Sequence, residues 1–310
     1  MSLSVAGKYA VITGAGSGIN LAFARLLLQR GCSVLIGDLA LRPEAEQLLS
    51  EYPPAATTSS PTPSANNKPT ALFQRTDVTS WPQLSALMAR ASSAFPRVDI
   101  VVPGAGIFEP AASSFWDAPG TPRSRDPADA EPGSYATIAV NLTHPIRLSQ
   151  LAIGRWTERG ERGTLVHVSS CAGHMVGIGT PLYFASKHGL HGFVRSLGGL
   201  RDELGIRVSA VAPGTVRTPM WGEDPDKKGM VREGEGDVAI EPEEIAEAML
   251  ELCENEEYGD GTILEVLQGA TRVVPLYGNV VPSGRGLMVS GYEQMQKDLY
   301  EKLRTEGLKV

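Results

Sequence analysis

The sequence predicts one α/β domain in which helices cover both faces of a single parallel β-sheet. Short apolar runs of strand type alternate with longer runs of helical periodicity. A glycine-rich loop lies between the first such strand and the first such helix. The chain has 310 residues, 42% of them hydrophobic, which is enough for one substantial core. Alternating β and α units favour parallel pairing because each helix crosses over between two strands of the sheet.

The predicted elements follow from these patterns in chain order. Strands are expected near 8–13, 32–37, 70–75, 98–102, 163–169, 205–212 and 261–267. Helices are expected near 18–30, 42–51, 80–94, 134–157, 183–203 and 242–254. An amphipathic helix is also expected at 291–308, which could pack on another subunit, close over a substrate or cover its own domain.

Several segments interrupt the alternation. Residues 53–69 are rich in proline and poor in apolar residues, and are predicted to form a mobile surface loop. Residues 107–133 and 219–240 follow the fourth and sixth strands. Because ligands of such sheets bind at the carboxyl ends of the strands, these two segments are candidate substrate walls, with 219–240 as a lid. Residues 271–310 are assigned to a C-terminal extension of the single domain, 1–310.

Residues 14–20 (GAGSGIN) form the glycine-rich loop between the strand at 8–13 and a helical pattern at 21–28. Glycines let the backbone approach a pyrophosphate, and the helix N-terminus attracts its negative charge. Ile19 stands where the Gly-x-Gly-x-x-Gly pattern needs its last glycine, so the loop alone is a weak indication. Between a strand and a helix it predicts a doubly wound, Rossmann-type dinucleotide fold.

Asp38 ends the second predicted strand, 20 residues after Gly18. A carboxylate at about this distance is expected to bond the hydroxyls of the adenosine ribose and to repel a 2′-phosphate. No arginine lies next to the glycine loop or directly after Asp38. The sequence therefore predicts NAD in preference to NADP. The alternative interpretation of Asp38 is a turn residue at the end of a strand.

Tyr183 and Lys187 are four residues apart, and Ser170 lies 13 positions before Tyr183. Four residues are about one helical turn, so a helix would put the phenol and the ammonium on one face. A free tyrosine has a pKa near ~10, and an adjacent cation is expected to lower it. With a serine hydroxyl nearby, the three side chains could move a proton on or off an alcohol oxygen. An exposed pair on a helix surface is the alternative for Tyr183 and Lys187 alone.

Taken in order, these motifs resemble the classical branch of the short-chain dehydrogenase/reductase family over roughly residues 5–270. Residues 13–19 (TGAGSGI) are similar to that family's cofactor loop, and 213–218 (PGTVRT) to the loop that holds the nicotinamide carboxamide. The segment that begins at Tyr183 is most similar to the NAD-dependent 15-hydroxyprostaglandin dehydrogenase group.

The resemblance implies roles for individual residues. Ser170, Tyr183, Lys187 and Asn141 match the catalytic set, in which Lys187 would also hold the nicotinamide ribose and Asn141 would position a water through its backbone. The cofactor-binding positions that it implies are Gly14, Ser17, Gly18, Ile19, Asp38, Asp77, Val78, Gly104, Ala105, Gly106, Tyr183, Lys187, Pro213, Gly214, Val216 and Thr218.

Two positions depart from the family pattern. Asn20 stands where a third glycine is usual, so its side chain could crowd the pyrophosphate or bond the cofactor or a neighbouring backbone group. Gly104 replaces the usual asparagine after the fourth strand, so the amide that would brace the adjoining strands is lost. Neither change affects Ser170, Tyr183 or Lys187. They put cofactor affinity in doubt more than the chemistry.

The predicted function is hydride transfer between NAD(H) and a lipophilic secondary alcohol or ketone, with Tyr183 as the acid/base. Candidate lining residues are mostly apolar, which favours such a substrate: Phe108, Trp116, Met175, Val176, Leu182, Met220 and Trp221. Two other classes stay open. A lyase or isomerase could use the same tyrosine and lysine without redox chemistry, and a dinucleotide-sensing protein could bind the cofactor without catalysis.

The composition restricts partners and location. A net charge of −7 and a pI near 5.4 argue weakly against a nucleic-acid partner. No apolar run is long enough to span a membrane, and the first residues do not resemble a signal peptide. Three widely spaced cysteines suit a reducing compartment, so a cytoplasmic protein is expected.

No metal-ligand spacing is present, and His144, His174 and His188 are interpreted as structural hydrogen-bonding residues. The resemblance also predicts a homodimer or homotetramer.

Overall fold

The centre of the protein is one eight-stranded sheet with the strand order β3-β2-β1-β4-β5-β6-β7-β8. The computed structural model describes residues 3–54, 68–109, 113–122, 124, 126–129, 131, 133–222, 230–231, 237–277 and 292–308. The strands are β1 (Tyr9–Thr13), β2 (Ser33–Asp38), β3 (Ala71–Arg75), β4 (Ile100–Val102), β5 (Gly163–Val168), β6 (Ile206–Pro213), β7 (Asp260–Leu267) and β8 (Ala270–Val273). The first seven run parallel, and β8 is antiparallel to β7. The predicted fold class is confirmed.

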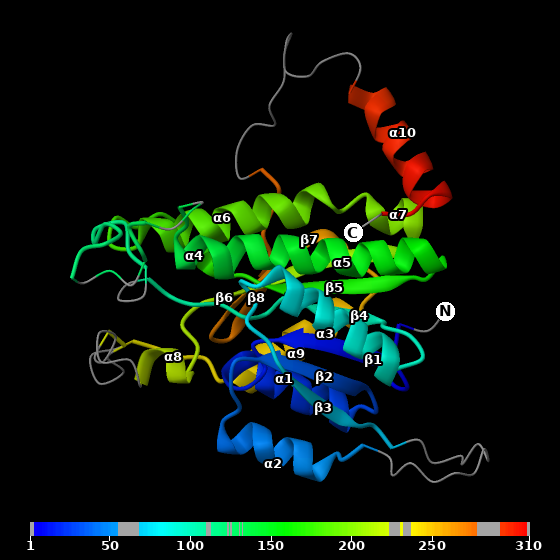
Figure 1. The fold of residues 1–310 in the computed structure, drawn as a ribbon, viewed down its shortest axis with the longest axis horizontal. Helices are drawn as coiled ribbons and strands as arrows, with labels where there is room; N and C mark the ends of the chain where they lie inside the picture. Colours follow the sequence, from blue (N-terminus) through cyan, green and yellow to red (C-terminus); the bar gives the residue numbers. More distant parts are fainter. Residues whose placement is uncertain are drawn as a thin grey trace.

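Helices cover both faces of this sheet (Figure 1). One face packs against α1 (Gly18–Gln29), α2 (Pro43–Glu51) and α9 (Pro242–Glu254). The other face packs against α3 (Trp81–Ala94), α5 (His144–Arg159) and α6 (Pro181–Ser196). The strand interiors are buried, as expected for parallel strands that are covered on both sides. Each face carries its own apolar cluster, so the sheet separates two halves of one core.

The predicted helix at 134–157 is divided. It contains α4 (Ala136–Ile138), a π-helical turn at Ala139–Thr143 and then α5. Pro145 has no N–H to donate to the carbonyl of Asn141, four residues earlier, and its ring would crowd that carbonyl in a regular helix. A π-turn avoids this conflict, and such turns are frequent at functional sites. The prediction missed it because the apolar periodicity continues across the proline.

The predicted helix at 183–203 is also divided, into α6 and α7 (Leu200–Leu204). Gly198 and Gly199 lie between them, and a Cβ on either would overlap a neighbour, the carbonyl of Asp260 or the hydroxyl of Tyr300. The break therefore lets β7 and the C-terminal helix approach closely. That helix, α10 (Tyr292–Thr305), buries Leu303 against the same core cluster.

Strand β8 was not predicted. Gln268 and Gly269 join it to β7 in a tight turn, in which Gly269 takes a left-handed φ of 68°. Residues 270–273 are exposed along their whole length, so no apolar alternation marks them as a strand. The predicted extension at 271–310 therefore begins inside the sheet.

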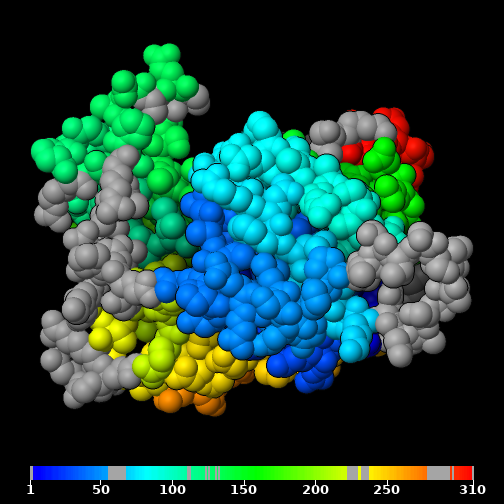
Figure 2. Space-filling model, turned by 60° about the horizontal axis from the view of Figure 1, so that its bottom comes forward, coloured from blue at the N-terminus to red at the C-terminus, as the bar shows by residue number. Residues whose placement is uncertain are grey.

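Two of the predicted loops meet at one edge of the molecule. The segment after β4 (green) and the one between β6 and α9 (yellow-green) lie on the same side in both views (Figures 1 and 2). The second segment contains α8 (Pro219–Gly222). Most of the predicted loop at 53–69 falls outside the described residues, and so does most of 219–240. Among the helices that are described, none is long and apolar enough to cross a membrane.

Candidate active site

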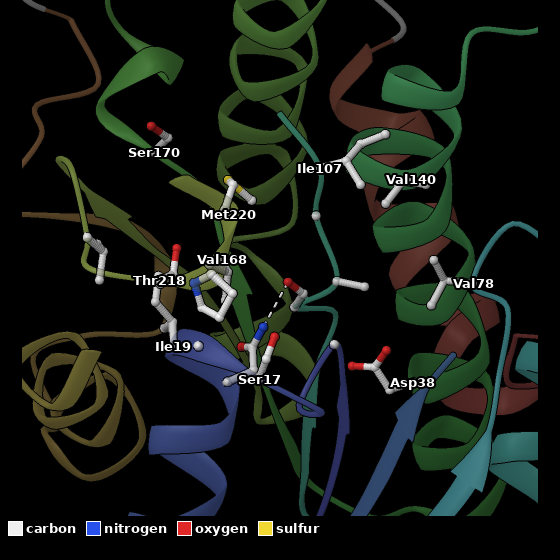
Figure 3. Close-up of a pocket in the computed structure, with 18 of the residues that line it drawn as sticks. Ser17, Ile19, Asp38, Val78, Ile107, Val140, Val168, Ser170, Thr218 and Met220 are labelled. Carbon is white, nitrogen blue, oxygen red and sulfur yellow. Dashed lines mark hydrogen bonds between the residues drawn. The ribbon is translucent and has the colours of Figure 1, made fainter. Parts of the chain in front are cut away.

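A crevice of ≈ 340 Å³ opens at the carboxyl ends of the parallel strands. It lies where the strand order reverses between β1 and β4, which is where such sheets bind ligands. Every cofactor-binding position predicted from the sequence lines it, and so does Ser170. In Figure 3, Asp38 and Val78 lie toward one end of the crevice and Ser170 toward the other. Motifs that are far apart in the sequence therefore line one space, as the predicted mechanism requires.

The glycine loop has the geometry that a dinucleotide needs. Gly14 takes a φ of 75°, and a Cβ there would lie 2.6 Å from the Cα of Ala105. A Cβ on Gly16 would lie 2.8 Å from Oδ2 of Asp38, so both positions require glycine. Ser17 precedes α1 without a side-chain cap, which leaves the first amides of the helix available to a phosphate. The residues present therefore fit a bound dinucleotide.

Asp38 faces this loop from the end of β2. Its Oδ2 accepts a hydrogen bond of 2.8 Å from the Gly16 N–H, and its Oδ1 accepts one of 2.7 Å from the Leu39 N–H. The carboxylate is thus fixed by two backbone donors beside the loop. It still lines the crevice, beside the glycine loop.

A buried network braces the strands on either side of the crevice. Thr13 Oγ1 accepts a hydrogen bond of 3.0 Å from the Gly104 N–H and lies 3.0 Å from His144 Nε2. His144 Nδ1 must donate to the Val140 carbonyl, 3.1 Å away, so its Nε2 accepts from Thr13. Burial lowers the pKa of His144 to about 4, which keeps the imidazole neutral. The predicted structural role of His144 is consistent with these contacts.

Tyr183 lies in the first turn of α6 and points into the crevice. Burial raises the pKa of its phenol above the ordinary value, and a hydrogen bond with Ser170 opposes this effect. The net shift is thus opposite in direction to the lowering expected from the neighbouring Lys187. The reason is the apolar surroundings, whose desolvation of the phenolate dominates.

Lys187 lies one turn further along α6. Its Nζ is 5.6 Å from the centre of the Tyr183 ring and donates a hydrogen bond of 3.0 Å to the Val168 carbonyl. Burial lowers its pKa to about 8. The ammonium also faces Gly106, where a Cβ would lie 3.9 Å from Nζ. The two side chains therefore share one face of the helix and one wall of the crevice.

Asn141 lies behind this wall instead of lining it. Its Oδ1 accepts from the Ile107 N–H at 2.9 Å, and its Nδ2 donates to the Ile107 carbonyl at 2.8 Å. This reciprocal pair fixes the chain after β4. Because Pro145 cannot donate to the Asn141 carbonyl, the π-turn leaves that oxygen without its usual helical partner. A carbonyl of this kind can hold a water.

Aromatic rings pack next to Tyr183. The Phe108 ring lies 4.7 Å from that of Tyr183 and 4.9 Å from that of Trp221, measured between centroids. Met220 and Trp221 line the crevice. Five predicted wall residues are not part of the lining: Phe108, which packs behind it, and Trp116, Met175, Val176 and Leu182. Trp116 is instead held outside by its Nε1, which donates to the Ile178 carbonyl at 2.7 Å.

Comparison with known proteins agrees with this geometry. The family model for short chain dehydrogenases matches residues 8–229. The chain belongs to the short-chain dehydrogenase/reductase family. Members of this family are NAD(P)-dependent enzymes that act on alcohol groups, so the chain is an oxidoreductase of that type.

Curated relatives of this dehydrogenase include two with different substrates in their names. A cis-4-hydroxycyclohexanecarboxylate dehydrogenase from Sinomonas cyclohexanicum is 34% identical over 279 residues, which cover 88% of this chain and 100% of the relative. Human 15-hydroxyprostaglandin dehydrogenase [NAD(+)] is 30% identical over 223 residues, 70% of this chain and 71% of the relative. A crystal structure of a short-chain type dehydrogenase/reductase from Mycobacterium marinum has a TM-score of 0.66 at 23% identity and covers 86% of this chain and 96% of its own. At 23% identity, the likeness to the Mycobacterium marinum protein shows the fold alone.

Glu109 is a residue of this dehydrogenase that the sequence did not single out. Its carboxylate is fully buried, and it accepts from the Tyr183 N–H at 3.0 Å and the Phe115 N–H at 2.7 Å. Thr180 provides no side-chain cap for α6, so Glu109 caps that helix from the other side of the crevice. It thereby ties the segment after β4 to the turn that carries Tyr183.

We expect Glu109→Gln to lower kcat by roughly tenfold. Glutamine keeps one acceptor oxygen, so one of the two backbone donors would face an NH₂ group and remain unbonded, at a cost of about 1–3 kcal/mol. Steady-state kinetics and thermal unfolding would measure the two effects. Asp126→Asn is the matched control, because Asp126 is a buried carboxylate of the same segment that accepts from the Ala136 N–H. An equal loss of kcat in both variants would contradict a specific link to Tyr183.

A group of possible metal ligands appears only in the fold. Cys171, His174 and Glu265 bring their ligand atoms within 4.8 Å of one another, although the sequence shows no ligand spacing. Glu265 already pairs with Arg272 and lies 2.6 Å from His174 Nε2. Burial raises the pKa of the Cys171 thiol to about 11, so no thiolate is present at neutral pH. The contacts are those of an ion-pair network that holds the loop after Ser170.

Proposed function

We propose that the protein transfers a hydride between NAD(H) and an uncharged, lipophilic secondary alcohol or ketone, with Tyr183 as the acid/base. One observation carries the proposal: Tyr183, Ser170 and Lys187 line the same crevice as the glycine loop. An acid/base group next to the nicotinamide end of a dinucleotide site is what alcohol–ketone interconversion requires.

Bound NAD(H) would accept or donate the hydride, and the protein would manage the proton. In oxidation, the Tyr183 phenolate takes the hydroxyl proton as the carbinol hydride leaves. In reduction, the protonated phenol gives that proton to the forming alkoxide. Ser170 is placed to bond the same oxygen and to stabilise its negative charge. Because burial raises its pKa, Tyr183 is protonated at neutral pH, which is the form needed for reduction.

Lys187 and Asn141 would support the proton transfer at Tyr183. The Lys187 ammonium is held 5.6 Å from the phenol ring by the Val168 carbonyl. In this position it can bond ribose hydroxyls and favour the developing phenolate. The Asn141 carbonyl, which lacks the i+4 N–H because residue 145 is proline, would hold a water beside it, through which protons could exchange with solvent.

NAD is proposed over NADP because Asp38 holds a negative charge at the adenosine end of the crevice. Two backbone amides fix this carboxylate, so it cannot readily swing away from a 2′-phosphate. The printed names of the 15-hydroxyprostaglandin dehydrogenase relatives specify NAD(+). Both observations favour the same cofactor.

An uncharged substrate is proposed from the side chains around Tyr183. Phe108 packs against the Tyr183 ring and against Trp221, and Met220 and Trp221 line the crevice with apolar surface. Among the described residues that line the crevice, Lys187 is the one cation, and it already bonds the Val168 carbonyl. A substrate carboxylate would find no further cation among them. The name of the Sinomonas relative specifies a cyclic secondary alcohol that carries a carboxylate, so it supports the ring and the alcohol of the proposed substrate but not the absence of charge.

A screen of uncharged cyclic and aromatic secondary alcohols and ketones tests the proposal. We expect turnover with NAD(H), followed by the absorbance of the reduced nicotinamide, and weaker turnover of carboxylated analogues. Conversion of a substrate without any change in that absorbance would instead indicate the lyase or isomerase class. Binding of NADH without turnover of any compound would favour the sensing protein.

In the same assay, Asp38→Asn should reduce the preference for NADH over NADPH by roughly one to two orders of magnitude, because it removes the charge that repels the 2′-phosphate. Asp77→Asn is the matched control: Asp77 also lines the crevice, but its Oδ1 caps a turn through the Thr79 N–H and hydroxyl. Fluorescence titration with both nucleotides measures the ratio. An unchanged ratio in Asp38→Asn would contradict the assignment.

The assembly and location stay predictions. The homodimer or homotetramer expected from the family resemblance would use the outer faces of α5 and α6. A cytoplasmic location is expected from the cysteine content. Size-exclusion chromatography with light scattering would determine the assembly directly.

A further inference from the structure

Two positions that look unrelated in the sequence meet in the structure. Asn20 lies in the first turn of α1, and Gly104 follows β4, 84 residues later. The Asn20 Nδ2 donates a hydrogen bond of 2.9 Å to the Gly104 carbonyl, and the bond is buried. A carbonyl can only accept, so the orientation of the amide is determined by its partner.

The space between the two positions is filled by the asparagine. A Cβ on Gly104 would lie 2.6 Å from both Cγ and Nδ2 of Asn20. Gly104 has no left-handed φ, unlike Gly14 and Gly18, so its backbone conformation does not require glycine. Glycine is required at 104 because the side chain of residue 20 occupies the place where a side chain of residue 104 would lie.

The bond helps to fix the wall of the cofactor crevice. The Gly104 N–H donates to Thr13 of β1 and its carbonyl accepts from Asn20 of α1, so the peptide groups of this residue are held from two sides. The next residue, Ala105, lies so close to Gly14 that a Cβ on the glycine would be 2.6 Å from its Cα. A shift of the chain at 104–106 would therefore change the space beside the glycine loop.

We infer that Asn20 and Gly104 form one interdependent pair that positions the 104–106 wall for the cofactor: the amide that braces this wall comes from the helix, and the strand end has no side chain so that it fits. Asn20 is a positioning residue, and either change alone is harmful. The inference rests on the proposed function for the identity of the nucleotide. The interdependence itself concerns only the protein.

The test is a double-mutant cycle with Asn20→Ala, Gly104→Ala and the combined variant. Each is measured by thermal unfolding without nucleotide and by fluorescence titration with NADH. We expect Gly104→Ala to lower the unfolding temperature and to weaken NADH binding more than tenfold, because its methyl group overlaps Asn20. In the Asn20→Ala background the space is open, so the same change should weaken binding less than threefold. If the Gly104→Ala change allows folding only when it is combined with Asn20→Ala, that result also supports the interdependence of the two positions.

A matched control separates positioning from general stability. Ser33→Ala removes a hydrogen bond from the Thr70 N–H at the opposite end of β2, so it should lower the unfolding temperature without changing the NADH dissociation constant. Additive effects of the two single changes, or a combined variant that fails to fold, would overturn the pairing. Interdependent unfolding temperatures with unchanged NADH binding would overturn the positioning role. If the wild type binds no NADH, the proposed cofactor fails, and the unfolding measurements still decide the pairing.

Discussion

Tyr183→Phe is expected to lower kcat by roughly 10³-fold, within the 10²–10⁴ range that general acid–base catalysis contributes. The change removes one hydroxyl and leaves the ring, whose contacts with Phe108 hold that wall of the crevice. NADH binding should therefore weaken by no more than about tenfold, the scale of one lost neutral hydrogen bond. Steady-state kinetics on a substrate from the screen and NADH titration measure the two quantities.

The control for this change is Tyr52→Phe. Tyr52 follows α2, packs against the core cluster on the other face of the sheet and does not line the crevice. It should retain wild-type kcat. Full NAD-linked turnover by Tyr183→Phe would refute the acid/base assignment, whereas loss of NADH binding would show that the hydroxyl serves the cofactor instead.

Lys187→Met is expected to lower kcat by about 10²-fold and at the same time to stabilise the protein at pH 7. The activity falls because the cation that favours the phenolate is removed. The stability rises because a buried ammonium is costly: lowering its pKa from 10.5 to about 8 corresponds to roughly 3 kcal/mol. Loss of the bond to the Val168 carbonyl offsets about 1 kcal/mol of this gain. The unfolding temperature of Lys187→Met should be a few degrees higher than that of the wild type.

The pH dependence gives a second readout of the same group. Between about pH 8 and 10.5 the folded wild type binds fewer protons at Lys187 than the unfolded chain does. The contribution of this residue to stability therefore rises with pH across that window, and Lys187→Met should lack the rise. Lys8→Met is the matched control for the loss of kcat. Burial also lowers the pKa of Lys8, and its Nζ bonds the Leu3 carbonyl, but Lys8 does not line the crevice. A destabilised Lys187→Met protein at pH 7 would contradict the argument.

The secondary structure was predictable where one pattern dominated. Strands β1, β2 and β5 have continuous apolar runs, and the sequence located them to within about a residue or two. The π-turn at Asn141 was missed because one proline outweighs a periodic pattern that continues past it. Strand β8 was missed because it is an exposed edge strand, whose pairing comes from the turn at Gly269 rather than from burial.

The candidate site shows the same division. Ser170, Tyr183 and Lys187 could be found from spacing because a helix places residues four apart on one face. Glu109 could not, since it acts by capping a helix that begins 72 positions later. The wall residues Trp116, Met175 and Val176 were assigned from apolar character alone. That character does not say which side of a loop faces the crevice.

The sequence by itself determined the fold class, the glycine loop and the candidate acid/base side chains, because each depends on residues close together in the chain. Only the tertiary structure decided that burial raises the pKa of Tyr183, that Glu109 caps its helix, and that the side chain of Asn20 fills the space at Gly104. These effects depend on desolvation and on close contact between distant segments. Both are properties of the packed chain, and local sequence carries no direct signal of them.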